Sequence, residues 1–181
     1  EESMKKTNHI NSAKRTLDIE SKALAKLAAN LDQKFSNLCE VILKSKGKII
    51  TLGVGKSGHI AQKISATLSS TGSPSYFIHA TEALHGDIGV ISKNDSVLIL
   101  SHSGESKEII DLIPSLKNIG CKIFSFTGPT ESTIAKSTDI NISTEVDKEA
   151  CPLDLAPTSS TTAALALGDA LAIALLESRK F

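Results

Sequence analysis

The sequence lacks the residues on which several classes of protein depend. Among its 181 residues there are no Trp, one Tyr and five Phe, so aromatic side chains that could stack on nucleic-acid bases are scarce. The 20 basic and 20 acidic residues cancel to a net charge of zero, and no long basic cluster occurs. This balance argues against binding to nucleic acid or to a membrane surface. We therefore expect neither among its partners.

The chain is also poor in cysteine and in long apolar runs. Cys39, Cys121 and Cys151 are odd in number and have no C-x-x-C spacing, which predicts reduced thiols in a cytoplasmic protein rather than a disulfide framework. Residues 1–14 are polar and lack the apolar core of a signal peptide. The longest apolar stretch, 163–176, is interrupted by a glycine and an aspartate and is too short to span a bilayer, so we expect a buried helix there.

The spacing of apolar residues alternates along the chain between the helical and the strand period. Residues 11–46 have apolar residues every three or four positions, which predicts helix with a break at Asp32 and an end at Gly47. Five strands are expected after this segment, at 48–52, 75–78, 95–100, 121–126 and 139–143. Helices are expected between them, at 59–71, 107–119 and 132–136, with a last helix at 159–178.

Strands that alternate with helices predict right-handed crossovers and a parallel sheet covered on both faces. The expected fold class is therefore α/β, a three-layer α-β-α sandwich with a five-stranded parallel sheet of flavodoxin or Rossmann type. The length suits one domain, in which N-terminal helices (1–46) join a core (47–181). Ligands of such sheets bind beyond the carboxyl ends of the strands.

A stretch of hydroxyls, residues 101–106 or the serine loop, follows the third strand and opens a helix. Gly104 allows close approach of the backbone, and Ser101, Ser103 and Ser106 can each donate a hydrogen bond to a phosphate oxygen. Ordinary serine capping is the alternative, but three serines in six residues exceed what a cap needs. We favour a phosphate site.

The first strand runs into Gly53-Val54-Gly55-Lys56-Ser57-Gly58, the glycine loop. It matches the G-x-G-x-x-G pattern of a dinucleotide site, but the acidic residue expected at the end of the second strand is missing. It is not a P-loop, because Ile50 stands in place of the first glycine. Lys56 and Ser57 then suit an anion or a polarised oxygen, and a dinucleotide-dependent oxidoreductase is the weaker alternative.

A third hydroxyl-rich helix start precedes the apolar run, with Thr158, Ser159 and Ser160 at its head. Three such helix starts around one cleft suit a small phosphorylated ligand better than a dinucleotide. The alternative is that each is simply a well-capped helix.

These stretches together resemble the sugar isomerase (SIS) domain family, specifically its arabinose-5-phosphate isomerases. The resemblance rests on residues 53–59, His85-Gly86-Asp87, the serine loop, 148–153 and 155–162. It implies an aldose–ketose isomerase that interconverts D-ribulose 5-phosphate and D-arabinose 5-phosphate through an enediol, on the route to the lipopolysaccharide sugar Kdo. A non-catalytic sugar-phosphate-binding domain, a sensor or a truncated enzyme, is the alternative.

The resemblance also implies roles for single residues. Lys56 stabilises the enediolate oxygen or holds the ligand. His85 contacts the substrate, with opening of the sugar or shuttling of protons as its catalytic role. Glu108 or Glu149 is the base, with a slight preference for Glu149. The residues implied to bind the substrate or its phosphate are Gly55, Ser57, Gly72, Ser73, Ser101, Ser103, Gly104, Ser106, Thr158, Ser159 and Ser160.

No cofactor is implied, whereas His79 matches a metal-binding position at which zinc would be inhibitory rather than catalytic. The resemblance further implies a homotetramer with N-terminal helices in the interface and His85 reaching a neighbour's site. His102 replaces the Asn usual in the family's serine loop. Many members continue into a pair of CBS domains, so this chain, which stops at Phe181, is either an excised domain or a short natural form.

Overall fold

Five short apolar segments form a parallel sheet at the centre of the computed structural model, which describes residues 8–180. The strands are β1 (Ile49–Gly53), β2 (Ser75–His79), β3 (Ser96–Ser101), β4 (Lys122–Thr127) and β5 (Ile140–Ser143). Their order is β2-β1-β3-β4-β5, and every neighbouring pair is parallel. The predicted sheet is confirmed, with strand ends within one or two residues of those expected.

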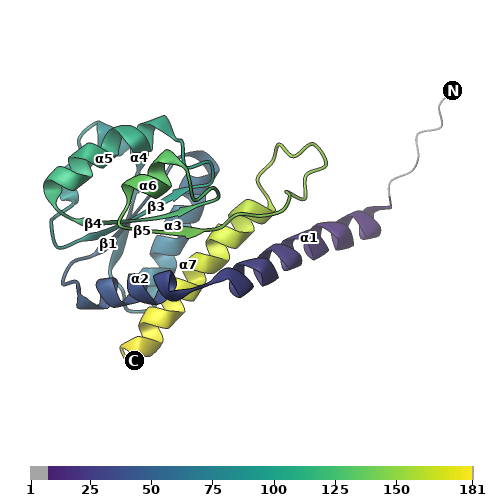
Figure 1. The fold of residues 1–181 in the computed structure, drawn as a ribbon, viewed down its shortest axis with the longest axis horizontal. Helices are drawn as coiled ribbons and strands as arrows, with labels where there is room; N and C mark the ends of the chain where they lie inside the picture. The colour runs from purple at the N-terminus through teal and green to yellow at the C-terminus, as the bar shows by residue number, and fades with distance from the viewer. Residues whose placement is uncertain (1–7, 181) are drawn as a thin grey trace.

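Helices cover both faces of this sheet and make the predicted three layers (Figure 1). One layer contains α1 (His9–Asn30), α2 (Gln33–Lys44), α3 (Gly55–Ser70) and α7 (Ser159–Ser178). The other contains α4 (Ala80–Leu84), α5 (Lys107–Ile119) and α6 (Thr133–Ser137), with a 3-10 turn, η1 (Asp87–Val90).

Sequence spacing predicts a loop over 79–87, but the structure has α4 there and the start of η1. α4 begins because the Nδ1 atom of His79 accepts the N–H of Thr81 at 3.2 Å and caps the first turn. A helix of five residues is too short to reveal an apolar period, so sequence spacing missed it.

Alternating side chains of the strands fill the two halves of the core. Ile49, Leu98 and Phe124 belong to the cluster under α2, α3 and α7, whereas their neighbours Ile50 and Val97 belong to the cluster under α4 and α5. Strands buried on both faces read as continuous apolar runs, which is why they stood out in the sequence. The sheet is thus a rigid platform for the loops at its carboxyl edge.

Helix α1 extends well beyond the rest of the molecule (Figure 1). Its inner end contacts α7, and only Ala23 and Leu27 are buried. Ile10 and Leu17, on the extending part, are 67% and 66% exposed. The break predicted at Asp32 is confirmed, since its carboxylate accepts the N–H of Lys34 and caps α2.

Helix α7 is the helix among residues 8–180 that is long and apolar enough to cross a membrane, judged by length and composition alone. In this fold it packs against α3 and α1 and buries Leu167, Leu171 and Leu175. Gly168 lies against Ile64 of α3, where a larger side chain would collide. α7 is therefore a core helix, as the sequence predicted.

Candidate active site

A cleft of about 610 Å³ opens at the carboxyl edge of the sheet. Five segments line it: the start of α3, the serine loop, residues 144–149 after β5, residues 154–157 of the loop that follows, and the start of α7. The topology produces this meeting, because parallel strands end at the same edge of the sheet and each is followed by its loop.

The glycine loop brings Lys56 and Ser57 into this cleft. A Cβ atom at Gly53 would lie 2.9 Å from the backbone of Ser57 and Gly58, so only glycine permits this tight entry into α3. Gly55 starts the helix with a φ of 56°, in the left-handed region. Within the described part of the chain no side chain caps α3, so its first-turn N–H groups are open to solvent or a ligand.

The serine loop forms a second helix start that no side chain of residues 8–180 caps. Ser106 precedes α5, but its hydroxyl lies 3.1 Å from the Ser101 Oγ instead of capping the helix. Ser101 Oγ also accepts the N–H of Gly104, whose φ of 69° turns the loop back on itself. Ser101, Ser103 and Ser106 all line the cleft. Hydroxyls together with open N–H groups at the positive end of a helix suit a phosphate.

The start of α7 differs, because a carboxylate of the protein already occupies it. Glu149 Oε2 accepts hydrogen bonds from the N–H of Thr158 at 2.7 Å, the Thr158 hydroxyl at 3.0 Å, the Ser159 hydroxyl at 3.3 Å and the N–H of Ser160 at 3.2 Å. Burial disfavours the ionised form, but hydrogen bonds from Ser160 and Thr158 outweigh it and lower the pKa of Glu149 from 4.5 to about 2.

This arrangement bears on the prediction that Thr158, Ser159 and Ser160 bind the substrate or its phosphate. A negative carboxylate already accepts from this turn and would repel a phosphate dianion placed beside it. Ser159 is further committed, since its hydroxyl donates to the carbonyl of Lys148. The starts of α3 and α5 are thus open to an anion, whereas the start of α7 binds the carboxylate of Glu149 at the cleft.

Ser160 is the exception in this turn, because its Oγ meets no partner at hydrogen-bonding geometry among residues 8–180. The residue is 2% exposed and lines the cleft. Its Oγ lies near enough to Glu149 to favour the ionised carboxylate, yet it reaches no partner at hydrogen-bonding geometry within residues 8–180. An unpaired buried hydroxyl costs about 1–3 kcal/mol.

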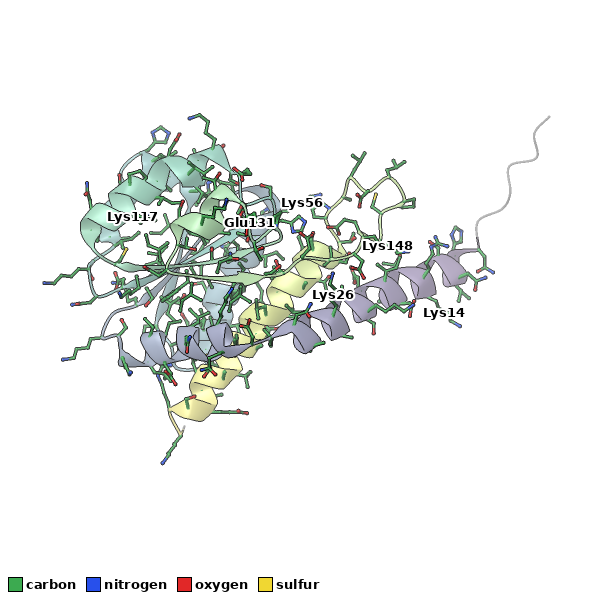
Figure 2. The ribbon with its side chains drawn as sticks, in the orientation of Figure 1. Lys14, Lys26, Lys56, Lys117, Glu131 and Lys148 are labelled. Carbon is green, nitrogen blue, oxygen red and sulfur yellow. The ribbon has the colours of Figure 1, made fainter. Side chains whose placement is uncertain are left out.

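Residues 144–149 complete the wall of the cleft, and of these the sequence predicts only Glu149 as a site residue. Lys148 lies near Lys56 on the side of the molecule where the loop before α7 begins (Figure 2). Asp147 pairs with Lys26 of α1 at 2.7 Å and ties that helix to the loop. The sequence predicts a strand that ends at residue 143. Because the residues that follow a parallel strand lie at the carboxyl edge of the sheet, that prediction was sufficient to place 144–149 at the cleft.

Several predicted residues do not reach the cleft of this single chain. Glu108, in the first turn of α5, and His85, at the end of α4, are both exposed and do not line it. Gly72 and Ser73 precede β2 and so lie at the opposite, amino edge of the sheet, where the Ser73 hydroxyl accepts from Arg179. That placement separates them from the serine loop within one chain.

The predicted metal position at His79 has no cluster of ligands around it among the residues that the structure describes. Its Nδ1 caps α4, and its ring packs edge-on against Phe77 at a centroid distance of 6.5 Å. In the part of the chain that the structure describes, no group of three or more His, Cys, Asp or Glu side chains is placed to hold a metal ion.

The cleft therefore combines an anion site with a cation and a carboxylate. The serine loop can hold a phosphate, Lys56 can stabilise a negative oxygen, and Glu149 can accept or hold a proton. Aldose–ketose isomerisation needs these three functions.

Comparisons with known proteins agree with this geometry. The sequence profile of the SIS domain family matches residues 42–174. "Arabinose 5-phosphate isomerase KdsD" of Pseudomonas aeruginosa is 52% identical over 172 residues, which cover 95% of this chain and 53% of that protein. The same-named protein of Escherichia coli K12 is 50% identical over 168 residues, 93% of this chain and 51% of that protein. The chain thus spans about half the length of these relatives.

Among solved structures, that of E. coli CFT073 c3406 in complex with arabinose 5-phosphate superposes with a TM-score of 0.94 at 44% sequence identity. The match covers 98% of this chain and 95% of that one. The similarity therefore extends over α1 and α7 as well as the sheet.

Proposed function

The chain belongs to the SIS domain family, and on that premise we propose that it interconverts D-ribulose 5-phosphate and D-arabinose 5-phosphate through an enediol. The observation that carries this proposal is the cleft itself, in which an uncapped helix start lined with serines faces Lys56 and Glu149. The relatives named as arabinose 5-phosphate isomerases and the solved complex with arabinose 5-phosphate support the choice of substrate.

Each end of the substrate has its own partners in this proposal. The 5-phosphate binds the serine loop and the open N–H groups of α5, while the C1–C2 end meets Lys56 and Glu149. Glu149 moves the proton between C1 and C2, because it lines the cleft whereas Glu108 does not. Lys56 stabilises the negative oxygen of the enediolate. The reaction transfers protons only and needs no redox cofactor.

We further propose that four copies assemble and that a neighbour supplies His85. The extension of α1, with Ile10 and Leu17 exposed, provides an apolar surface for such contacts (Figure 1). His85 and Glu108 are exposed and lie outside this chain's own cleft, as residues that serve a neighbouring site would. Light scattering on the purified chain tests the assembly, and a monomer would contradict it.

A cytoplasmic location suits a sugar-phosphate enzyme with three free cysteines. Binding of inhibitory zinc at His79 would require further ligands in addition to this histidine, for example from a second copy of the chain.

The test is an NMR assay of the purified chain with D-ribulose 5-phosphate in deuterated water. Appearance of D-arabinose 5-phosphate with deuterium at C2 supports the enediol route. Lys56→Ala should abolish turnover, whereas Lys93→Ala, at the amino edge of the sheet, should not.

Absence of turnover would contradict the enzyme proposal. The melting temperature with and without D-arabinose 5-phosphate then shows whether the chain still binds a sugar phosphate. Stabilisation without turnover favours the alternative, a binding domain or a truncated enzyme, and no stabilisation would overturn the sugar-phosphate assignment itself.

A further inference from the structure

His102 is a titratable side chain in the middle of the serine loop, between Ser101 and Ser103, which both line the cleft. His102 lines the cleft as well, and it is exposed. The imidazole of His79, by comparison, is committed to the fold, because its Nδ1 caps α4. An exposed imidazole in the wall of a cleft is open to a ligand.

Gly128, directly after β4, fixes the place of this imidazole. The N–H of Gly128 donates to the carbonyl of His102 at 2.9 Å and joins the loop after β4 to the serine loop. A Cβ atom at Gly128 would lie 2.9 Å from Cε1 and 3.1 Å from Nδ1 of the ring, so the ring packs directly on the glycine backbone. The Ser143 hydroxyl donates to the Gly128 carbonyl at 2.7 Å and holds this glycine from the side of β5. The imidazole is therefore positioned by two neighbouring strands at the cleft.

A histidine at this place adds what the rest of the phosphate site lacks. The serine hydroxyls and the open N–H groups of α5 are neutral donors, which hold an anion by hydrogen bonds and by the helix dipole. A hydrogen bond from an imidazolium to a phosphate oxygen is shorter and about twice as strong as one between neutral groups. The charged form of His102 would therefore strengthen the hold on a phosphate dianion.

The charges on the elements around the ring favour its protonated form. Those elements are the serine loop, the loop 128–132 after β4, the wall 144–149 and the start of α3. Their acidic side chains are Glu105, Glu131, Glu145, Asp147 and Glu149, and their basic side chains are Lys56 and Lys148. The acidic side chains outnumber the basic ones, so an imidazolium meets more attraction than repulsion here.

We propose that His102, as an imidazolium, donates a hydrogen bond to the phosphate of the bound sugar, so that the chain binds its substrate most tightly in mildly acidic solution. The proposal rests on the proposed isomerase function and deepens it. Histidine is the side chain that ordinarily changes charge between pH 5 and 8. Because the bond needs the protonated ring, the contribution of His102 is present at low pH and is lost as the pH rises through the titration of the ring.

His102→Asn tests this proposal, because an amide keeps a hydrogen-bond donor but has no charge. At pH 6 its KM for D-ribulose 5-phosphate should be about 5- to 20-fold above that of the wild type, with kcat within about twofold. At pH 8.5 the two KM values should agree within about twofold. The phosphate of the substrate itself titrates near pH 6, but it does so equally for both proteins, and the effect cancels in the ratio of their KM values.

Two further variants separate charge from other effects of the substitution. His102→Lys has a positive charge at both pH values, so its KM relative to that of His102→Asn should be lower at pH 8.5 as well as at pH 6. His9→Asn removes an exposed histidine at the outer end of α1 and should keep the wild-type KM at both. Because residue 102 is exposed, His102→Asn should melt within about 2 °C of the wild type.

Inorganic phosphate, used as a competitive inhibitor at pH 6, identifies the part of the substrate that meets the ring. Its inhibition constant should rise in His102→Asn by the same factor as KM. An unchanged inhibition constant beside a raised KM would show that the ring meets the sugar, and would overturn the proposal. A KM ratio near one at pH 6, or equal at both pH values, would overturn the role of the charge. An inactive wild type would overturn the proposed function on which the inference rests.

Discussion

Replacing Glu149 with Gln should destabilise the protein at neutral pH but not in acid. The glutamine keeps the size of the side chain and one acceptor oxygen, but it removes the charge that accepts from Thr158, Ser159 and Ser160 at the start of α7. The lowered pKa of Glu149, about 2 instead of 4.5, sets the size of this effect.

A fall of that size corresponds to at most about 3 kcal/mol of folding free energy. Water reaches the carboxylate from the cleft and screens it, so we expect about 1–2 kcal/mol at pH 7, or a melting temperature about 2–8 °C lower. Because the pKa is lower in the folded state than in the unfolded state, the native protein binds fewer protons. The stabilisation is therefore complete above about pH 5 and is lost as the pH falls toward 2.

Urea unfolding of the wild type and Glu149→Gln at pH 7, 5, 4 and 3 measures this difference. Glu145→Gln is the matched control in the same segment: its carboxylate is exposed and accepts the N–H of the neighbouring Val146, so it should change stability by less than about 0.5 kcal/mol. A gap between wild type and Glu149→Gln that stays constant from pH 7 to pH 3, or no gap at pH 7, would refute the role assigned to the charge.

Three further substitutions test the packing around the site. Gly104→Ala would drive a Cβ atom into Ser132, so calorimetry should show D-arabinose 5-phosphate affinity reduced more than about tenfold; an equal loss in Gly120→Ala, which has a positive φ but no close neighbour and lies at the far end of α5, would contradict this. Gly168→Ala collides with Ile64, and thermal unfolding should show a loss of about 1–3 kcal/mol; an unchanged midpoint would refute the close α3–α7 contact. Lys26→Ala breaks an exposed ion pair with Asp147, so unfolding should show a loss of at most about 1 kcal/mol that shrinks with added salt, and a salt-independent loss would point to another cause.

The sequence alone predicted the alternation of strands and helices, the break at Asp32 and the serine loop at the start of α5. These features depend on short-range causes: the two-residue and 3.6-residue periods of burial, the capping of a helix by its own flanking side chain, and the backbone freedom of glycine. The same rules could also have placed Gly72 and Ser73 at the amino edge of the sheet, because they precede a strand instead of following it.

Only the tertiary structure showed that Glu149 occupies the start of α7 and that Lys26 ties α1 to Asp147, 121 positions away. Sequence spacing treated three hydroxyl-rich helix starts as equivalent, since each has the residues that bind an anion. A helix start can bind an anion only if no carboxylate of the protein already accepts from its N–H groups. At α7 the carboxylate of Glu149 does so, because the long loop before α7 folds back onto the helix start. Local propensity does not encode the packing of such a loop.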